Sequence, residues 1–600
     1  MRIAVLVKQV PLIEEIALDR DGRLARSGVP MEMNPHCRRA VAKGVELAAA
    51  TGGSCTVVTM GPMTARQVLV EALDFGCDDG VLISDPAFAG SDTLATARAL
   101  AAALTLAGPF DLILTGRNSV DADTGQVGPQ LAELTGLPFL AGVRELRLAG
   151  QVLTARTERD DGWRDSVVAL PAVLSCAERL CAPAKRPDAV ETPALRDRIR
   201  LVTAADLGAG PWGQAGSPTR VGTLRRLTSV RAGTVLAGGL DAQAGRIAEI
   251  LESAAADTAP ARPHPGMAGQ AGAYPVAVLA QPGRPRITRE LLGEAARLSP
   301  GRVTAVLSGT DLTPQTAECW GADEAVIVSG HPGHPGHPGR PSAEEDIASA
   351  VAGWCLDRGP RALLGPGTSW GREVAARIAA RLGAGLVGDA VELALEEGQL
   401  ICQKPVAGGS TLAAVYADSA VQLVTVRPGV LATPVSRVPA GIPVISLTAP
   451  ADSRVTHVRQ WTDSGIDELA SARIVIGVGA GVDPDDYPLL RELAASVGAE
   501  LAATRKVTDR GWQPHGRQVG VTGRSIAPEV YLALGLSGKD HHTIGVRRAA
   551  TVVAVNRDPD APVFRTADLG VVADWRPVVR ALLDRLRAAR RPPAAASAAR

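Results

Sequence analysis

Short runs of aliphatic and β-branched residues alternate with longer amphipathic runs through most of the chain. In the first third, strand-like runs at residues 3–7, 56–60 and 111–115 are separated by helix-like patterns that include residues 38–51 and 93–106. Strands that are separated by helix-length connections predict right-handed βαβ units and a mainly parallel sheet. The pattern therefore indicates the α/β fold class.

The same alternation begins twice more along the chain. An Ala-, Pro- and Gly-rich stretch over residues 254–273 has no apolar periodicity and predicts a flexible linker. Strand-like runs resume at residues 274–280 and again at 473–476, and the polar stretch 454–465 is expected to bridge the two series. Because 600 residues exceed what one hydrophobic core usually supports, we expect three parallel-sheet domains. The predicted segments are a first domain at 1–254 that ends in a helix over 242–253, a linker at 255–272, domains at 273–461 and 462–586, and a disordered tail at 587–600.

Charge and composition narrow the class of protein. The 63 Lys and Arg residues balance the 63 Asp and Glu residues, so no global field favours nucleic acid or an anionic membrane surface. No run approaches the roughly 20 apolar residues that span a bilayer, and the apolar run at residues 3–7 is too short for the core of a signal peptide. We therefore expect a cytoplasmic protein with no membrane insertion and no nucleic-acid partner.

Potential metal ligands are sparse. The eight cysteines are scattered, and Cys176 and Cys181 lack the second pair that would complete a zinc ligand set. A repeat at residues 331–339 carries three histidines but no cysteine or acidic residue, so we interpret it as a surface loop. The sequence predicts no metal centre.

The most informative loop of the first domain follows the strand at residues 111–115. It combines glycines that allow close backbone approach with two acidic residues: Gly116, Gly125, Gly128, Asp121 and Asp123. Residues 124–128 can begin a helix whose free N–H groups face a phosphate. A nucleotide fits these features, and an ordinary Asp-rich turn fits them equally well. In the second domain, residues 365–372 form another helix start that suits an anion.

In the third domain, a glycine-rich turn at residues 477–482 follows the first strand. It fits the nicotinamide dinucleotide fingerprint poorly, because the third glycine of G-x-G-x-x-G would fall at Val482. The second strand also ends at Thr504-Arg505 rather than at an acidic residue that could hold a ribose. Arg505 keeps its charge at any working pH and can lie against a flavin ring, but an exposed ion pair explains it equally well.

Later loops of this domain carry groups that suit a phosphate, a ribose or the edge of a polar heterocycle. In order, they are Thr522 between Gly520 and Gly523, Ser537-Gly538, His541-His542, Asn556 and Asp574. Taken alone, two adjacent histidines are more often exposed to solvent than functional. No Ser-His-Asp grouping, pair of catalytic carboxylates or P-loop is evident, and a protein that only relays electrons needs none.

Taken together and in order, these motifs resemble those of the electron transfer flavoproteins, with a β subunit at about 1–254 fused ahead of an α subunit at about 273–600. The motifs that carry the resemblance are Asn34-Pro35, residues 116–128, 519–523, 527–531 and 535–538, His542, residues 556–559 and 572–574. The resemblance implies three nucleotide-binding-type parallel-sheet domains. The first corresponds to the β subunit, the second to the N-terminal part of the α subunit, and the third to the C-terminal, FAD-binding part of the α subunit.

The resemblance also implies two sets of cofactor-binding residues. FAD would be lined by Thr504, Arg505, Val519, Gly520, Val521, Thr522, Ser537, Gly538, His541, His542, Asn556 and Asp574. Arg505 would lie over the flavin ring, Thr522 near its N5 edge and His542 near the pyrimidine carbonyl. AMP or a second FAD would be lined by Asn34, Gly116, Asp121, Asp123, Thr124, Gly125, Gln126, Val127 and Gly128.

By the same resemblance, we expect an electron carrier rather than a classical enzyme. It would accept electrons from a flavin-dependent dehydrogenase and pass them singly to an acceptor such as a quinone reductase. The alternatives are a two-flavin, electron-bifurcating protein that oxidises NADH and a non-redox nucleotide-binding regulatory protein. The chain departs from the family's usual pattern in having Ala480 in place of an arginine, Lys539 as an added charge and His541 in place of a glutamine.

Overall fold

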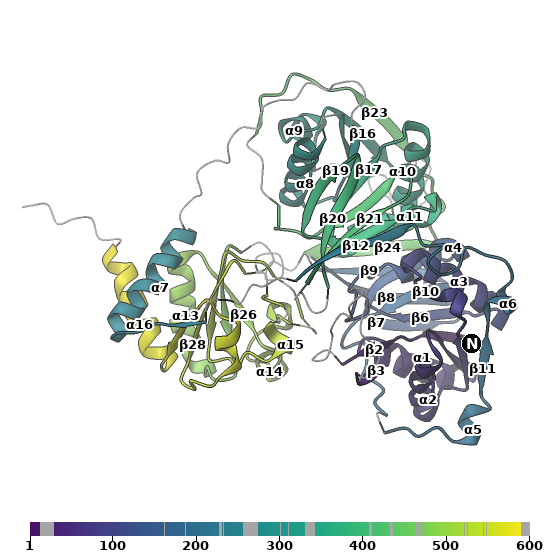
Figure 1. Ribbon diagram of the computed structural model, residues 1–600, viewed down its shortest axis with the longest axis horizontal. Coiled ribbons are helices and arrows are strands. Elements are labelled where there is room, and N and C mark those ends of the chain that lie inside the picture. The colour runs from purple at the N-terminus through teal and green to yellow at the C-terminus, as the bar shows by residue number, and fades with distance from the viewer. Residues whose placement is uncertain are drawn as a thin grey trace, which may run out of the picture. The chain divides into compact units, whose positions relative to one another are not determined.

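The computed structural model divides into two compact units, which are described separately (Figure 1). Unit 1 comprises Met1–Leu227 and Pro260–Trp461, and unit 2 comprises Thr228–Ala259 and Thr462–Arg600. The described residues are 1–589 except 13–28, 161, 187, 227–230, 232, 256–273, 300–301, 310, 331–342, 407–410, 432–435, 463–468, 470–471, 521–522, 525, 544 and 548. Nearly all of the predicted linker, the three-histidine repeat and the tail beyond Ala589 therefore lie outside the described residues.

The first half of unit 1 is built on a ten-stranded sheet whose first seven strands are parallel. In spatial order the strands are β11 (Ile199–Val202), β5 (Asp79–Ile83), β4 (Ser54–Met60), β1 (Arg2–Leu6), β6 (Leu112–Gly116), β10 (Ala172–Cys176), β7 (Phe139–Ala149), β8 (Val152–Arg159), β9 (Gly162–Ala169) and β24 (Val455–Thr462). Alternate residues of β1 point to opposite faces, as the two-residue period of a strand requires. Ile3 and Val5 pack with α1 (Cys37–Thr51) and α2 (Arg66–Phe75), whereas Ala4 and Leu6 pack with α3 (Thr93–Ala107) and α4 (Val127–Thr135).

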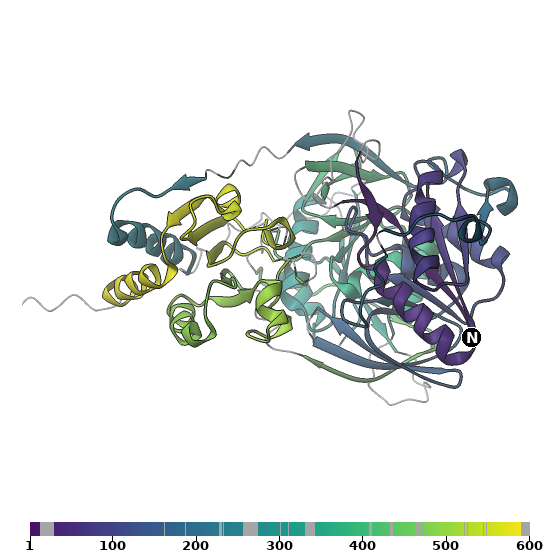
Figure 2. The same ribbon diagram turned by 90° about the horizontal axis from the view of Figure 1, so that it is seen from below.

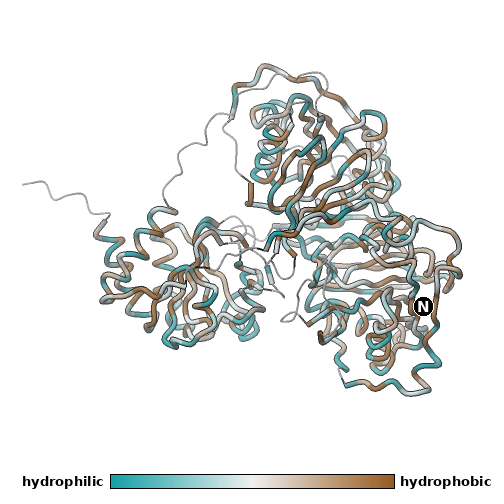
Figure 3. The backbone as a smooth tube through the Cα atoms, viewed as in Figure 1, coloured by the Kyte–Doolittle hydropathy of each residue, from teal (hydrophilic) through white to brown (hydrophobic). Residues whose placement is uncertain are grey.

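The second half of unit 1 repeats this plan. Its seven parallel strands are β18 (Leu386–Ala390), β22 (Gln422–Val426), β17 (Ala362–Pro366), β14 (Val276–Ala280), β15 (Val303–Leu307), β16 (Glu324–Ser329) and β23 (Val444–Thr448). The helices α8 (Pro285–Leu298) and α9 (Pro314–Cys319) cover one face, and α10 (Glu344–Arg358) and α11 (Ser369–Leu382) cover the other. Hydrophobic residues accordingly gather on the inner strands of each sheet (Figure 3). The predicted α/β class is confirmed.

The two halves of unit 1 exchange edge strands. From the first half, β12 (Thr219–Arg226) pairs antiparallel with β21 (Thr411–Ala417) of the second half. On the other side of β21, β20 (Gln399–Val406) and then β19 (Glu392–Glu396) complete this four-stranded sheet. From the second half, β24 forms the last strand of the first sheet, beside β9. The prediction of a polar bridge at residues 454–465 was therefore wrong for Val455–Thr462. This strand is mostly exposed and lacks apolar alternation, so only its pairing with β9 identifies it.

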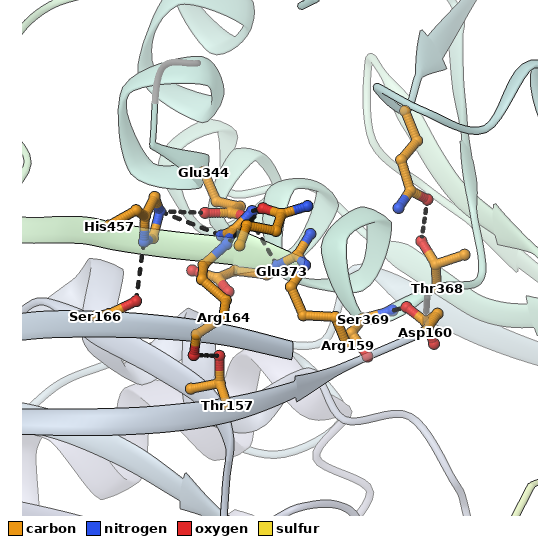
Figure 4. A network of polar contacts seen from close by, with 12 residues as sticks. Thr157, Arg159, Asp160, Arg164, Ser166, Glu344, Thr368, Ser369, Glu373 and His457 are labelled. Carbon is orange, nitrogen blue, oxygen red and sulfur yellow. Dashed lines mark hydrogen bonds and ion pairs between the residues drawn. The ribbon is translucent and has the colours of Figure 1, made fainter. Parts of the chain in front are cut away.

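A buried polar network joins the two halves where β9, α10, α11 and β24 meet (Figure 4). The Arg164 guanidinium donates to the Glu344 carboxylate at 2.8 Å, and Arg159 donates to the same carboxylate at 3.1 Å. His457 lies between Ser166, at 3.0 Å, and Glu344, at 3.3 Å. Nearby, the backbone N–H of Ser369 at the start of α11 donates to Asp160 at 2.6 Å. Separating ion pairs that are buried this deeply is costly, because each partner would be left buried without a counter-charge.

Unit 2 is a six-stranded parallel sheet with three long helices packed together on one face. The strand order is β13 (Thr234–Val235), β29 (Leu569–Val572), β28 (Thr551–Asn556), β27 (Val530–Leu534), β25 (Ile474–Val478) and β26 (Glu500–Ala503). The helices are α7 (Leu240–Ala255), α13 (Tyr487–Val497) and α16 (Trp575–Ala589). In both ribbon views α7 and α16 lie side by side (Figures 1 and 2).

The helix predicted at the end of the first domain belongs to unit 2. Ile247 and Leu251 of α7 are fully buried in the same core as Val578 and Leu582 of α16. Burying an aliphatic side chain of this size contributes roughly 1.5–3 kcal/mol, so β13 and α7 are structural parts of unit 2. At the other end of the unit, α16 continues to Ala589 and includes the first three residues of the predicted tail, where Arg587 pairs with Asp584 at 3.4 Å.

Candidate functional site

The carboxyl ends of the parallel strands of unit 2 lie along one edge of the sheet. The loops that follow β25, β26, β27, β28 and β29 begin at Gly479, Thr504, Gly535, Arg557 and Ala573. Ligands of open α/β sheets bind at this edge. Most of the residues that the sequence predicts for the FAD site are on these loops, so the fold brings separate segments of the sequence to one edge.

Two of these loops are in direct backbone contact. A Cβ atom added at Gly479 would lie 2.2 Å from the carbonyl oxygen of Gly535, and the N–H of Gly481 donates to that oxygen at 3.0 Å. Gly538 has φ +76°, and a Cβ there would lie 2.3 Å from the backbone of Val563. Only glycine satisfies these approaches without a backbone shift. The glycines therefore allow the backbone segments at this edge to pack directly against one another.

His542 lies beneath the edge and is buried. Its Nδ1 is 3.0 Å from the carbonyl oxygen of Val519, and its Nε2 is 2.7 Å from the hydroxyl of Tyr531. Because a carbonyl only accepts, Nδ1 donates to Val519 and Nε2 accepts from Tyr531. Burial lowers the pKa of His542 to about 4 despite the bond to Val519. The imidazole is therefore neutral near pH 7, with both nitrogens bonded to protein, which differs from the exposed position typical of a histidine pair.

The buried, neutral His542 predicts an acid-sensitive unit 2. A folded-state pKa depressed from about 6.5 to about 4 contributes stability that is present above pH 6.5 and lost as the pH falls through 4, by about 3 kcal/mol in total. We expect His542→Gln to remove much of this pH dependence from the unfolding temperature of unit 2, measured by scanning calorimetry. His515→Gln, at an exposed histidine of the same unit, is the control and should keep the wild-type profile. An unchanged profile in His542→Gln would contradict the assignment.

The remaining predicted residues of this edge have mixed surroundings. The Arg505 side chain is 62% exposed and pairs with Asp509 at 3.1 Å. An exposed pair of this kind is worth about 0.3–0.5 kcal/mol, so exchanging it for a ligand contact costs little. Ser537 is exposed and Thr504 is half-buried. Val521, Thr522 and the side chain of His541 lie outside the described residues.

Asn556, Asp574 and Gly520 shape the backbone at this edge. Asn556 donates to the carbonyl oxygen of Leu536 at 2.9 Å and so ties the ends of β27 and β28 together. Asp574 accepts from the N–H of Arg576 at 2.9 Å at the start of α16, and it lines an open groove of about 790 Å³ along that helix. Gly520 has φ +129° and donates to the carbonyl oxygen of Arg524. These residues position the loops whatever else they contact.

The other predicted site is the loop after β6 in unit 1. Asn34 is fully buried and donates to the carbonyl oxygen of Asn118 at 2.8 Å, which fixes the loop to the start of α1. Lys8, after β1, donates to both carboxylate oxygens of Asp121 at 2.7 and 2.8 Å. Asp121 is therefore neutralised by a cation. Within the described residues, no group of three or more His, Cys, Asp or Glu side chains could hold a metal ion.

The second part of this loop turns into α4. Asp123 and Gly125 have φ +47° and +64°, and Thr124 lies between them. Gln126 is buried, and both ends of its side-chain amide are bonded. The side-chain oxygen accepts from the hydroxyl of Thr93 at 2.7 Å, and the side-chain nitrogen donates to the carbonyl oxygen of Leu386, in the second half of the unit, at 3.4 Å. The side chain of the N-cap residue Gln126 makes no capping hydrogen bond to α4, so the first N–H groups of this helix, which begins at Val127, can face another acceptor such as a phosphate.

The sequence did not identify three cations that lie against this loop. Arg372, Lys404 and Arg427 come from α11, β20 and the residue after β22 in the second half of unit 1. The helix start at residues 365–372, which suits an anion, was the one sequence feature that pointed to Arg372. Neither Lys404 nor Arg427 stands in a motif that distinguishes it from an exposed cation.

The chain matches known proteins over most of its length. The family model "Electron transfer flavoprotein domain" matches residues 21–206 and again 277–452, and "Electron transfer flavoprotein FAD-binding domain" matches residues 468–547. The two matches to the first model coincide with the two similar halves of unit 1.

Among the described helices, none is long and apolar enough to cross a membrane.

Curated relatives match the two parts of the chain separately. An "Electron transfer flavoprotein subunit beta" of Thermoanaerobacterium thermosaccharolyticum is 34% identical over 258 residues, which cover 42% of this chain and 98% of the relative. The "Electron transfer flavoprotein subunit alpha" of the same organism is 31% identical over 311 residues, 50% of this chain and 92% of the relative. "Protein FixB" of Rhizobium meliloti is 33% identical over 306 residues, 48% of this chain and 85% of the relative.

Proposed function

Because the chain belongs to the electron transfer flavoprotein family, with a β-like part fused ahead of an α-like part, we propose that it accepts electrons from a flavin-dependent dehydrogenase and passes them singly to an acceptor such as a quinone reductase. Electron transfer and an FAD-binding domain follow from the family. The donor, the acceptor, a second nucleotide and the roles of individual residues are our proposals. The observation that carries the proposal is the match of residues 468–547 to the FAD-binding domain, on the unit whose loops meet at one sheet edge.

The residues at this edge suit a flavin nucleotide. When bound, FAD supplies a group that takes up two electrons and releases them one at a time. The glycine contacts hold the loops after β25 and β27 close together, Thr504 and Ser537 offer hydroxyls, and Arg505 offers a cation that leaves its surface pair at little cost. The end of β26 carries no acidic residue of the kind that holds the ribose in nicotinamide dinucleotide-binding folds. The hydrogen bonds of His542 to Tyr531 and Val519 hold the loop at Val519 in place. A contact between His542 and the flavin would replace one of these two bonds.

The loop at residues 116–128 is proposed to hold AMP or a second FAD. Its support is the uncapped start of α4 next to Gly125, together with the buried anchors Asn34 and Gln126. A phosphate at a helix N-terminus is stabilised by the free N–H groups and by the helix dipole. Two flavins would point to the bifurcating, NADH-oxidising alternative, whereas one flavin with AMP would point to a simple carrier.

Cofactor content tests the proposed function directly. We expect the purified chain to be yellow and to release one FAD and one AMP per chain on acid treatment, as measured by chromatography. It should also be reduced by a flavin-dependent dehydrogenase together with that enzyme's substrate. Two FAD per chain with reduction by NADH would favour the bifurcating alternative. A colourless protein that releases only AMP would contradict electron transfer and favour a regulatory nucleotide-binding protein.

A further inference from the structure

Three cations cluster at the carboxyl edge of the second sheet of unit 1, and one of them, Lys404, is buried. Arg427 bonds to the carboxylate of Asp389, and Arg372 lies 4.0 Å from the other oxygen of that carboxylate. Lys404 lies close enough to Asp389 to interact with its charge. Asp389 adopts φ +61°, a left-handed conformation that is rare and costly for a residue with a side chain. Three cations therefore share one strained carboxylate.

The cluster has one buried cationic donor without a partner. This donor is the Nη1 atom of Arg427, which bonds to no described residue. Lys404 is only 8% exposed, and no hydrogen bond or ion pair joins its ammonium group to any described residue. Burial lowers the pKa of both side chains, and the nearby carboxylates only partly offset this effect. Leaving cationic donors buried and unbonded is costly, so they are rare unless a ligand or water satisfies them.

The cluster lies directly against the loop at residues 116–128. Asp123 interacts electrostatically with both Lys404 and Arg427. A Cβ added at Gly125 would lie 3.9 Å from the Cδ of Arg372, and one added at Gly388 would lie 2.7 Å from the Gln126 amide nitrogen. The cations of the second half therefore lie beside the uncapped start of α4 in the first half.

We propose that Arg372, Lys404 and Arg427 bind the phosphate of the nucleotide held by the loop at residues 116–128. The proposal rests on the nucleotide site of the proposed function and makes that site a joint one, with the loop from the first half and the cations from the second. Counting Asp389 and Asp123, the cluster carries one excess positive charge before a ligand binds. A phosphate or pyrophosphate supplies the missing acceptors, and arginine and lysine are the side chains that recognise these groups.

Lys404→Met tests the proposal, because methionine keeps the length of the side chain and removes its charge. We expect the nucleotide-depleted full-length variant to bind AMP about 10- to 100-fold more weakly than wild type, the range for a lost charged hydrogen bond. Adenosine, which lacks the phosphate, should bind wild type and variant equally. Lys404→Arg should recover most of the AMP affinity. Titration calorimetry with AMP, adenosine and inorganic pyrophosphate measures these differences.

A matched control separates binding from folding. Lys43 is equally buried but is paired with Glu46 at 2.7 Å, so Lys43→Met should keep the wild-type AMP affinity. Without ligand, Lys404→Met should unfold at the same temperature as wild type or higher, because a charge that burial disfavours has been removed. A purely structural cation would instead lower that temperature.

The outcomes distinguish the inference from the proposed function. Unchanged AMP and pyrophosphate affinity in Lys404→Met would overturn the inference and leave a nucleotide site formed by the first half alone. If wild type bound pyrophosphate in a Lys404-dependent way but bound neither AMP nor FAD in this loop, the anion site would stand and the nucleotide assignment would fall. If wild type bound none of these ligands here, both would be overturned.

Discussion

A Gly538→Ala variant should lose most of its bound FAD and destabilise unit 2 by about 3 kcal/mol. The added Cβ would lie 2.3 Å from both the N and Cα atoms of Val563, and these are backbone atoms that cannot rotate away. The residue also has φ +76°, which costs any residue except glycine about 1 kcal/mol or more. The loop would have to move away from residues 562–566, and with it Ser537, which is proposed to contact FAD. Thermal unfolding and the flavin absorbance of the purified variant measure the two effects.

Gly511 provides the control for this variant. It has φ +72° in the same unit, and a Cβ there would have no atom within 4 Å. Gly511→Ala should therefore cost only the conformational part, about 1 kcal/mol, and keep FAD. Equal stability and equal flavin content in the two variants would show that the close contact with Val563 determines neither the stability of unit 2 nor its FAD binding.

The second large effect is expected at the buried network between the halves of unit 1 (Figure 4). Burial by itself would raise the pKa of the Glu344 carboxyl, but Arg164, Arg159 and His457 together hold it well below its usual value. Glu344→Gln keeps the shape of the side chain and removes the charge that these groups share. Breaking a buried pair in this way typically costs 3–5 kcal/mol, because the arginines are left buried without a counter-charge. We expect unit 1 to be destabilised by about 3 kcal/mol in chemical unfolding.

Another pair between the same halves is the matched comparison. Glu392 pairs with Arg225 at 3.2 Å, and both side chains are 60% exposed. Glu392→Gln should cost less than about 1 kcal/mol, since water screens the charges and replaces the lost bond. If the two variants were equally stable, burial of the Glu344 network would not contribute to joining the halves.

The core of the fold was largely predictable from local sequence. The strand predicted at residues 56–60 lies within β4, and the strand predicted at 111–115 differs from β6 by one residue at each end. Buried parallel strands are short apolar runs bounded by turn residues, so composition and spacing identify them. Parallel pairing then places the loops that follow them at one edge, which made the candidate cofactor loops predictable. The assignment of individual residues to FAD or AMP stays a prediction.

Edge strands and shared helices were not predictable in the same way. β24 exposes most of its residues, so it has no apolar alternation to distinguish it from a polar connection. The amphipathic pattern of α7 shows that one face is buried, but it does not show which surface covers that face. Only the tertiary structure assigns α7 to the core that contains Leu582, separate from the sheet that precedes it in the chain.

The sequence by itself therefore determined the α/β class, the family and the loops that carry the candidate chemistry, because these follow from local periodicity and from motifs. The tertiary structure decided which surfaces meet. It buried His542 against Tyr531, and it placed Lys404 and Arg427 beside a loop that lies more than 250 residues earlier in the chain. The physical reason is that the charge and hydrogen bonding of a side chain depend on burial and neighbours, and long-range packing sets both.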